Sequence, residues 1–129
     1  MNNFPTPIND LVEQAIRGIE ERNFEALENL SDALEAAGRV LNWNLAFVGK
    51  ILFHAKSNLD DCEEVVWDGQ EWKKSADVLT SLLRELIQYC EKNDLASMSR
   101  VLNSLVRESY RLQLEAAAHT KLAEEPESA

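Results

Sequence analysis

One hydrophobic template occurs twice in this chain, first in residues 11–41 and again 71 positions later in residues 82–112. Its apolar residues recur three and four positions apart, as they do along the buried face of an amphipathic helix. Each copy has a short polar break, at 22–23 and at 93–94, that fits a tight turn between two helices. The sequence therefore predicts two helical hairpins. The equivalent apolar positions are Val12 and Leu83, Ile16 and Ile87, Ile19 and Cys90, Phe24 and Leu95, Leu27 and Met98, Leu30 and Val101, Leu34 and Leu105, and Leu41 and Leu112.

A third amphipathic stripe lies between the two hairpins. The run Asn-Trp-Asn at 42–44 favours a helix end before it, because asparagine side chains compete for backbone hydrogen bonds. We therefore expect an all-α, single-domain bundle of four to five helices, built from hairpins 10–41 and 72–122 with a connecting helix 45–57. The stripe of that connecting helix consists of Leu45, Val48, Ile51, Leu52 and Ala55.

The length of 129 residues fits one domain that spans 1–129. We expect residues 1–7 to form a flexible arm and residues 124–129 a frayed acidic tail. No run of 18 apolar residues occurs, so no membrane span is expected. The N-terminus lacks the basic and apolar regions of a signal peptide, which predicts a cytoplasmic location.

The segment from Leu59 to Trp72 permits two interpretations. Asp68-Gly69 between β-forming residues is typical of a small hairpin. Alternatively, Trp72 opens the stripe of the next helix and Asp68-Gly69 forms only a turn, which is the interpretation we favour. Before that turn, Asp60 and Glu63 have the spacing of a capping box for a short helix.

The formal net charge of −10 argues against binding to nucleic acid or to an anionic membrane, since both need a basic surface. The two histidines, His54 and His119, lie in no Glu-x-x-His motif of the kind that builds di-iron bundles. Cys62 lies among carboxylates that would raise a thiol pKa. We therefore expect Cys62 and Cys90 to be buried apolar groups, and we expect no metal, no cofactor and no enzymatic activity.

Five carboxylates at helical spacing predict an acidic stripe along one face of the second helix of the first hairpin, and three arginines form a stripe of similar pitch on the last helix. Three interpretations remain open: a solvated acidic face, complementarity between these helices within the bundle or across a homodimer, and docking of a basic partner. The acidic residues are Glu21, Glu25, Glu28, Asp32 and Glu35, and the basic residues are Arg100, Arg107 and Arg111.

Large aromatic residues concentrate in the middle third of the chain. They either plug the open end of the bundle or line a groove for a partner helix, because tryptophan is enriched at binding hot spots. We include them with the acidic stripe as candidate partner-binding residues. These candidates are Trp43, Phe47, Trp67 and Trp72.

The run 15–25 resembles the first hairpin of small flagellar export chaperones, and 93–111 is similar to the closing hairpin of such bundles. The resemblance implies an acidic cytosolic bundle that holds a secretion substrate, and it transfers no binding residue. We accordingly expect a small chaperone, adaptor or regulator that binds a helical or basic segment of a protein partner. The alternatives are an antitoxin-like or immunity-type inhibitor that uses the acidic stripe, and a small enzyme.

Overall fold

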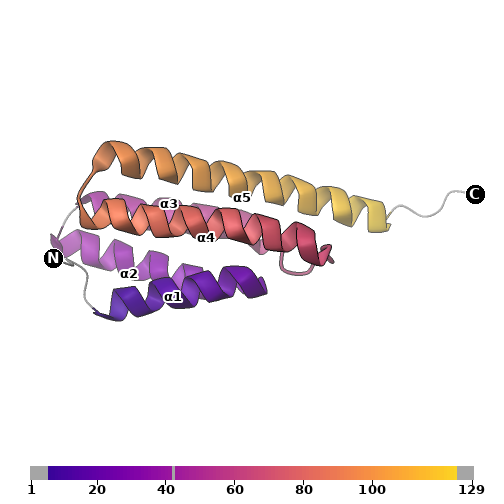
Figure 1. Cartoon of the computed structure of the whole chain (residues 1–129), viewed down its shortest axis with the longest axis horizontal. Coiled ribbons are helices and arrows are strands. Elements are labelled where there is room, and N and C mark those ends of the chain that lie inside the picture. The colour runs from indigo at the N-terminus through magenta and orange to yellow at the C-terminus, as the bar shows by residue number, and fades with distance from the viewer. Residues whose placement is uncertain (1–5, 42, 125–129) are drawn as a thin grey trace, which may run out of the picture.

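The structure, a computed structural model, describes the backbone of residues 6–41 and 43–124 and the side chains of residues 8–38 and 44–119. It confirms the all-α bundle, and no strand occurs among these residues. The helices run alternately up and down along one long axis (Figure 1). They are α1 (Thr6–Glu21), α2 (Glu25–Leu41), α3 (Trp43–Asp60), α4 (Gly69–Glu91) and α5 (Leu95–Glu124).

The five helices pack in a ring in the order α1, α2, α3, α5, α4 and back to α1. Each predicted hairpin is therefore an antiparallel pair, and α3 stands between α2 of the first hairpin and α5 of the second (Figure 1). One continuous core of apolar side chains fills the ring. Within the described residues, no helix is both long enough and apolar enough to cross a bilayer.

The two hairpin turns share one backbone geometry. Arg22 and Asn93, which are equivalent residues of the repeat, both adopt left-handed φ angles of 59° and 55°. In each turn the next N–H donates to the carbonyl five residues back, at 2.8 Å in the first turn and 3.0 Å in the second. This is the Schellman ending of a helix, in which the left-handed residue reverses the chain and pairs the last carbonyl groups. The sequence repeat is therefore also a repeat of backbone structure.

The residues after these turns cap the second helix of each hairpin. The side chain of Asn23 accepts from the N–H of Glu25 at 3.3 Å, and that of Asp94 accepts from the N–H of Ser97 at 3.2 Å. The hydrogen bond from the Ser97 hydroxyl, followed by the one from its backbone N–H, lowers the pKa of the Asp94 carboxyl. An unpaired helix N-terminus is satisfied in this way.

The equivalent apolar positions are buried in both hairpins wherever their side chains are described, with one exception. Phe24 is fully buried, whereas Leu95 at the same position of the second hairpin is 49% exposed. The difference arises because the crossover between α3 and α4 covers the first turn. The second turn lies at the opposite end of the bundle (Figure 1).

Several predicted boundaries need correction. The connecting helix α3 is longer than the predicted 45–57, and α4 begins at Gly69 because the Asp68 side chain accepts from the N–H of Gln70 at 2.9 Å and caps it. The alternative of a β-hairpin is wrong, as is the short helix capped by Asp60, which instead ends α3. The predicted arm 1–7 overlaps α1, which starts at Thr6; residues 1–5 and 125–129 lie outside the described part.

The contact between α2 and α3 is unusually close. A Cβ atom on Gly49 of α3 would lie 2.6 Å from the carbonyl oxygen of Ser31 and 2.7 Å from the backbone nitrogen of Glu35. Gly38 of α2 lies similarly against the backbone of Ala46. Both separations are shorter than any van der Waals contact of a methyl group, so the helix spacing depends on the absence of side chains at these two positions.

We predict that Gly49→Ala lowers the free energy of unfolding by about 1–3 kcal/mol, because the added methyl group must push the two backbones apart. The intrinsic helix propensity acts in the opposite direction and favours alanine by about 1 kcal/mol. Urea denaturation followed by circular dichroism measures the difference. Gly69→Ala is the matched control, since a Cβ at that position would meet nothing within 4 Å. An equal loss in both variants would contradict the close-contact explanation.

Candidate functional site

The predicted acidic stripe is distributed over two helices and two kinds of environment. Glu21 ends α1 and so does not belong to α2. Glu25 and Asp32 are exposed on α2, whereas Glu28 and Glu35 are partly buried on the flank that faces α3. The five carboxylates therefore do not form one continuous face on a single helix.

A lysine of α3 reaches into this stripe. The Nζ atom of Lys56 lies 3.4 Å from a carboxylate oxygen of Glu28 and 3.0 Å from one of Asp60. Partial burial acts to lower the pKa of Lys56, but the hydrogen bonds and charges of Asp60 and Glu28 outweigh it and leave the pKa raised. No Lys or Arg lies between Glu25 and Glu35 on α2, and the counter-charge at Glu28 comes from the neighbouring helix α3.

The two tryptophans near the crossover belong to the core. The indole N–H of Trp67 donates to the carbonyl of Cys62 at 3.0 Å, and that of Trp72 donates to the carbonyl of Ile19 at 3.1 Å. Their ring centroids lie 5.5 Å apart, and Trp72 also meets the ring of Phe24 edge to face at 6.0 Å. Both residues are buried, so we leave them out of the candidate binding surface. The side chain of Trp43 lies outside the described residues.

The crossover at 61–68 is held down on the first turn by polar contacts. Arg22 donates from its guanidinium to the carbonyl of Val65 and lies 6.0 Å from the centroid of the Trp72 ring. The N–H of Phe24 donates to the carboxylate of Glu63 at 3.2 Å. Glu63 therefore pairs with an unsatisfied N–H at the start of α2 and not within a capping box of its own. The interpretation of the tryptophans as a plug accounts for this end of the bundle.

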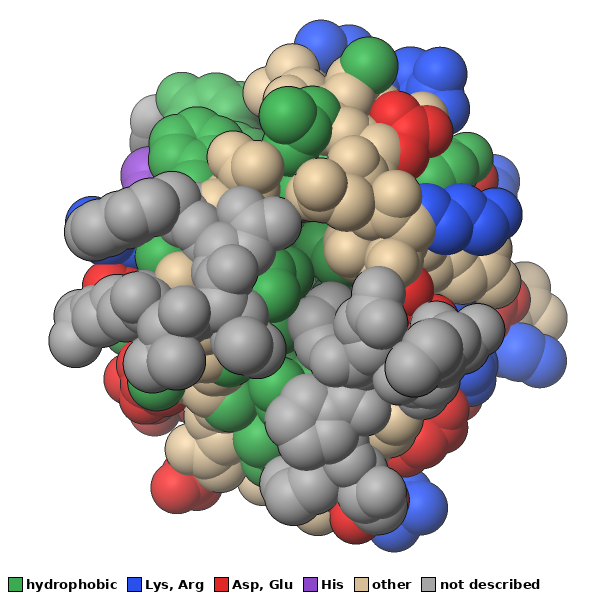
Figure 2. All heavy atoms as spheres, turned by 90° about the vertical axis from the view of Figure 1, so that its left-hand side faces the viewer, with side chains coloured by type: hydrophobic (Ala, Val, Ile, Leu, Met, Phe, Trp, Pro, Cys, Tyr) green, Lys and Arg blue, Asp and Glu red, His purple; other side chains and the backbone are tan. Residues whose placement is uncertain are grey.

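Exposed apolar side chains gather on α3 and α5, which are neighbours in the ring. On α3, Phe47 is 58% exposed and Phe53 is 43% exposed; on α5, Tyr110 is 53% and Leu114 54% exposed. The end-on view in Figure 2 shows hydrophobic side chains gathered on one flank, with charged side chains along much of the rim. Phe47 is among the binding residues predicted from the sequence, whereas Tyr110 and Leu114 are not. Their spacing of four, beside the buried stripe of α5, is the pattern that could have revealed them.

Phe53 lies beside the acidic flank of α2. Gly49 packs against Glu35 and Lys56 pairs with Glu28, so the α3 residues between them run alongside α2 residues 28–35. The Lys56 ammonium group lies 5.9 Å from the centroid of the Phe53 ring. We call the surface formed by Phe53 together with Glu25, Glu28 and Asp32 the α2–α3 face. Phe47 precedes Phe53 by six residues and so lies about 120° around α3 from it, on the side that meets α5 through Asn58.

The predicted basic stripe of α5 is only partly free. Arg111 donates to Glu108 and to Glu115 on the same helix, and Arg100 lies 6.0 Å from the ring centroid of Tyr89 on α4. Arg107 is exposed. Because α3 stands between α2 and α5, the acidic and basic stripes point outward from different sides of the molecule.

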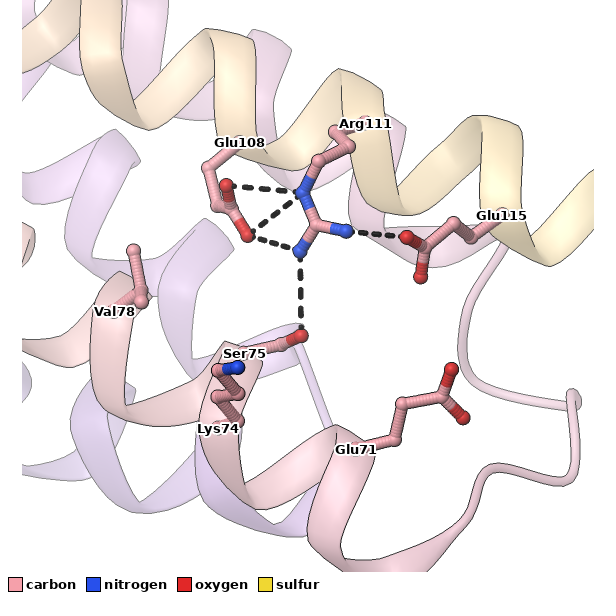
Figure 3. A pocket seen from close by; sticks show the side chains of 7 residues that line it. All are labelled: Glu71, Lys74, Ser75, Val78, Glu108, Arg111 and Glu115. Carbon is pink, nitrogen blue, oxygen red and sulfur yellow. Dashed lines mark hydrogen bonds and ion pairs between the residues drawn. The ribbon is translucent and has the colours of Figure 1, made fainter.

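A pocket of about 380 Å³ opens between α4 and α5 (Figure 3). Arg111 crosses it: its Nε donates to both oxygens of Glu108 at 3.2 Å, and another guanidinium nitrogen lies 3.5 Å from the hydroxyl of Ser75. The hydrogen bond to Glu108 is the main cause of the raised pKa of Arg111. Because its donors are directed at these partners, the positive charge of the guanidinium is already balanced by carboxylates of its own helix. The pocket offers a mixed-charge wall with Glu71 and Lys74 at its edge and no activated nucleophile.

The remaining chemically reactive residues lie apart from one another. Among the described residues, no group of three or more histidine, cysteine or acidic side chains is arranged to hold a metal ion. His119 stacks edge to face on Trp67, with ring centroids 5.1 Å apart. Glu115, four residues before His119 on α5, accepts from Arg111. His54 is exposed on α3.

Comparisons with known proteins supply no relative. No family model matches the chain, and neither a curated protein nor a solved structure is similar to it. The resemblance to flagellar export chaperones therefore has no further support, and the function must be argued from this molecule alone.

We predict that neither cysteine reacts with a thiol reagent such as DTNB at pH 8 while the protein is folded. Both are buried, and burial, with smaller effects from nearby carboxylates, raises the pKa of Cys62 and of Cys90 to about 12. The thiolate needed for attack is thus almost absent from the native state. Two thiols should titrate at once in denaturing urea, and rapid labelling of native protein would contradict the burial of these side chains.

Proposed function

We propose that this protein is a non-catalytic interaction module, a small cytoplasmic chaperone, adaptor or regulator, whose α2–α3 face binds a basic, amphipathic helical segment of a partner protein. The observation that carries the proposal is the exposure of Phe53 on α3 beside the carboxylates of α2, with Phe47 exposed on the outer side of the same helix. The faces of α3 that pack on α2 and α5 are already apolar. A helix with apolar side chains on its outer side as well is typical of one that is covered by another protein.

The chemistry of the α2–α3 face defines the segment that fits it. Burial of a phenylalanine side chain contributes roughly 1.5–3 kcal/mol, so the ring of Phe53 can anchor the apolar stripe of a docked helix. Lysine or arginine residues along the border of that helix would lie against Glu25 and Asp32, which are exposed. Charge of this kind mainly raises the rate of association and selects the orientation, while the aromatic contacts supply most of the affinity.

An inhibitor of the antitoxin or immunity type is the second candidate. It is favoured by the exposure of Glu25 and Asp32, which could enter a basic active site without help from α3. The two proposals differ in the importance of the phenylalanines. Loss of binding in Asp32→Lys but not in Phe53→Ala would favour the inhibitor.

We predict that a fluorescently labelled helical peptide with leucine on one face and lysine along its borders binds the protein, and that Phe53→Ala weakens binding about tenfold. The reason is the loss of one aromatic anchor from the centre of the α2–α3 face. Fluorescence anisotropy measures the affinity, and the same peptide with glutamate in place of lysine should bind much more weakly.

Two controls separate this face from the general acidity of the protein. Glu85→Lys on α4 changes the net charge as much as Asp32→Lys does, and both residues are exposed. Only Asp32→Lys should reduce the affinity strongly. If both substitutions weaken binding equally, the peptide recognises overall charge and the proposed site is wrong.

A further inference from the structure

A second exposed apolar surface lies along the contact between α3 and α5. Phe47 is exposed and precedes Asn58 by eleven residues, about three helical turns, so both lie on the same side of α3. Asn58 is buried there and donates to Ser109 of α5 at 3.1 Å. Ile51, which is partly buried, and His54, which is exposed, lie between them on this side of the helix. The row of α3 side chains beside α5 therefore begins with an exposed aromatic ring.

The facing row of α5 is apolar as well. Leu95 is exposed and precedes Gln113 by eighteen residues, five complete turns, so the two share one side of α5. Gln113 donates at 2.7 Å to Asp61, directly after α3, which identifies this side as the one beside α3. Val106, which is partly buried, and Tyr110, which is exposed, lie between them near the same side. We call the surface formed by Phe47, Ile51 and His54 of α3 with Leu95, Val106 and Tyr110 of α5 the α3–α5 face.

The α3–α5 face is free of formal charge at pH 7. Charged residues make up 28% of the chain, yet none of the six residues of this face is Lys, Arg, Asp or Glu. Exposed charged side chains lie at its borders: Lys50 is about 60° around α3 from Phe47, and Arg107 is about 100° around α5 from Val106. Depletion of charge together with exposed aromatic side chains is typical of the core of a protein–protein interface.

We infer that the α3–α5 face binds the same face of a second copy of this chain. In a two-fold contact, side chains near the axis meet copies of themselves, so any charge there would face a like charge. A face without charge avoids this repulsion. Two copies with a formal net charge of −10 each also repel one another as a whole, so apolar burial is the force that can hold them together. A basic segment, by contrast, would meet no carboxylate among the six residues of the face.

The directions of α3 and α5 select the arrangement of the two copies. The two helices run parallel (Figure 1), and the contact between Asn58 and Ser109 places Phe47 level with the first turn of α5. Leu95 begins that turn. A two-fold axis parallel to the helices sets α3 of each copy on α5 of the other, so Phe47 of each copy packs on the partner's Leu95. A perpendicular axis through the centre of the face would instead set Phe47 near the partner's Asp60, where a carboxylate offers no apolar contact.

The size of the face fits a weak, reversible dimer. It is roughly 25 Å long and two helices, or about 20 Å, wide. A contact of these dimensions buries on the order of 1,000 Å² over both copies, which is the lower bound for a specific interface. We therefore expect dissociation in the micromolar range and no obligate dimer.

The dimer goes beyond the proposed function and has a consequence for it. Phe53 and the α2 carboxylates lie on the other side of α3 from Phe47, so each copy keeps its α2–α3 face free in the dimer. One dimer would then present two such faces and hold two partner segments at once.

Sedimentation velocity of the purified protein from micromolar to submillimolar concentration, at low and at high salt, tests the inference. We expect a monomer–dimer equilibrium that strengthens with salt, because salt screens the repulsion between two acidic copies and the face itself contributes no ion pair. Phe47→Asp should weaken dimerisation about tenfold or more, since it removes an aromatic anchor and places two carboxylates in the contact. Tyr110→Asp should have the same effect from α5.

Phe53→Asp is the matched control, because it makes the same substitution at an exposed phenylalanine of the same helix, outside the α3–α5 face. It should leave dimerisation unchanged. A protein that stays monomeric at submillimolar concentration, one that grows beyond dimers, a dimer that salt dissociates, or an equal loss in Phe47→Asp and Phe53→Asp would each overturn the inference.

The two phenylalanines also separate the dimer from the proposed function. In the anisotropy assay, Phe53→Asp should weaken binding of the basic peptide, whereas Phe47→Asp should leave it unchanged. Failure of the dimer and failure of the proposed function are therefore distinguishable.

Discussion

The backbone contact between α2 and α3 at Gly38 and Gly49 sets the geometry on which the rest of this molecule depends. Because neither glycine carries a side chain, the two helices lie close together, and Lys56 of α3 pairs with Glu28 of α2 across their contact. The same contact fixes the register of α2 against α3, and Asn58 extends that register to α5 through Ser109. The positions of the acidic stripe of α2 and the basic stripe of α5 along the bundle axis are thus set by Gly38, Gly49 and the buried amide of Asn58.

The crossover between α3 and α4 solves a different problem, which is the closure of one end of the ring. Trp67 of the crossover and Trp72 at the start of α4 enter the core with both indole N–H groups paired to backbone carbonyls, so neither indole donor is left unsatisfied. Arg22, whose backbone is left-handed in the turn, donates a hydrogen bond from its guanidinium to the carbonyl of Val65. A large aromatic plug is thereby fixed by hydrogen bonds to segments far apart in sequence. This use of the aromatic residues leaves Phe47 and Phe53 of α3 for contact with a partner.

The acidic stripe on α2 and the basic stripe on α5 are too far apart to form ion pairs with each other within one molecule. The carboxylates of α2 and the arginines of α5 flank α3 on opposite sides, and Arg111 is already neutralised by Glu108 and Glu115. The exposed carboxylates of α2 and the exposed Arg107 of α5 therefore lie on different sides of the molecule.

The repeated apolar template determined the helical hairpins and their turns, because helix periodicity and short polar breaks are local properties of the chain. All of its own positions whose side chains are described are buried except Leu95. The sequence favoured a turn at Asp68-Gly69 with a helix from Trp72, and the structure begins that helix three residues earlier, at Gly69. It did not determine that Trp67 and Trp72 are buried or that Lys56 enters the acidic stripe. Nor did it predict that Glu63 would lie on the first turn. The positions of all these side chains depend on which helices become neighbours. Leu95 and Phe24 illustrate the limit: equivalent in the template, they differ in exposure because only one end of the ring is covered by the crossover. Long-range packing alone decides that, and it also decides which charges meet and which remain available to a partner.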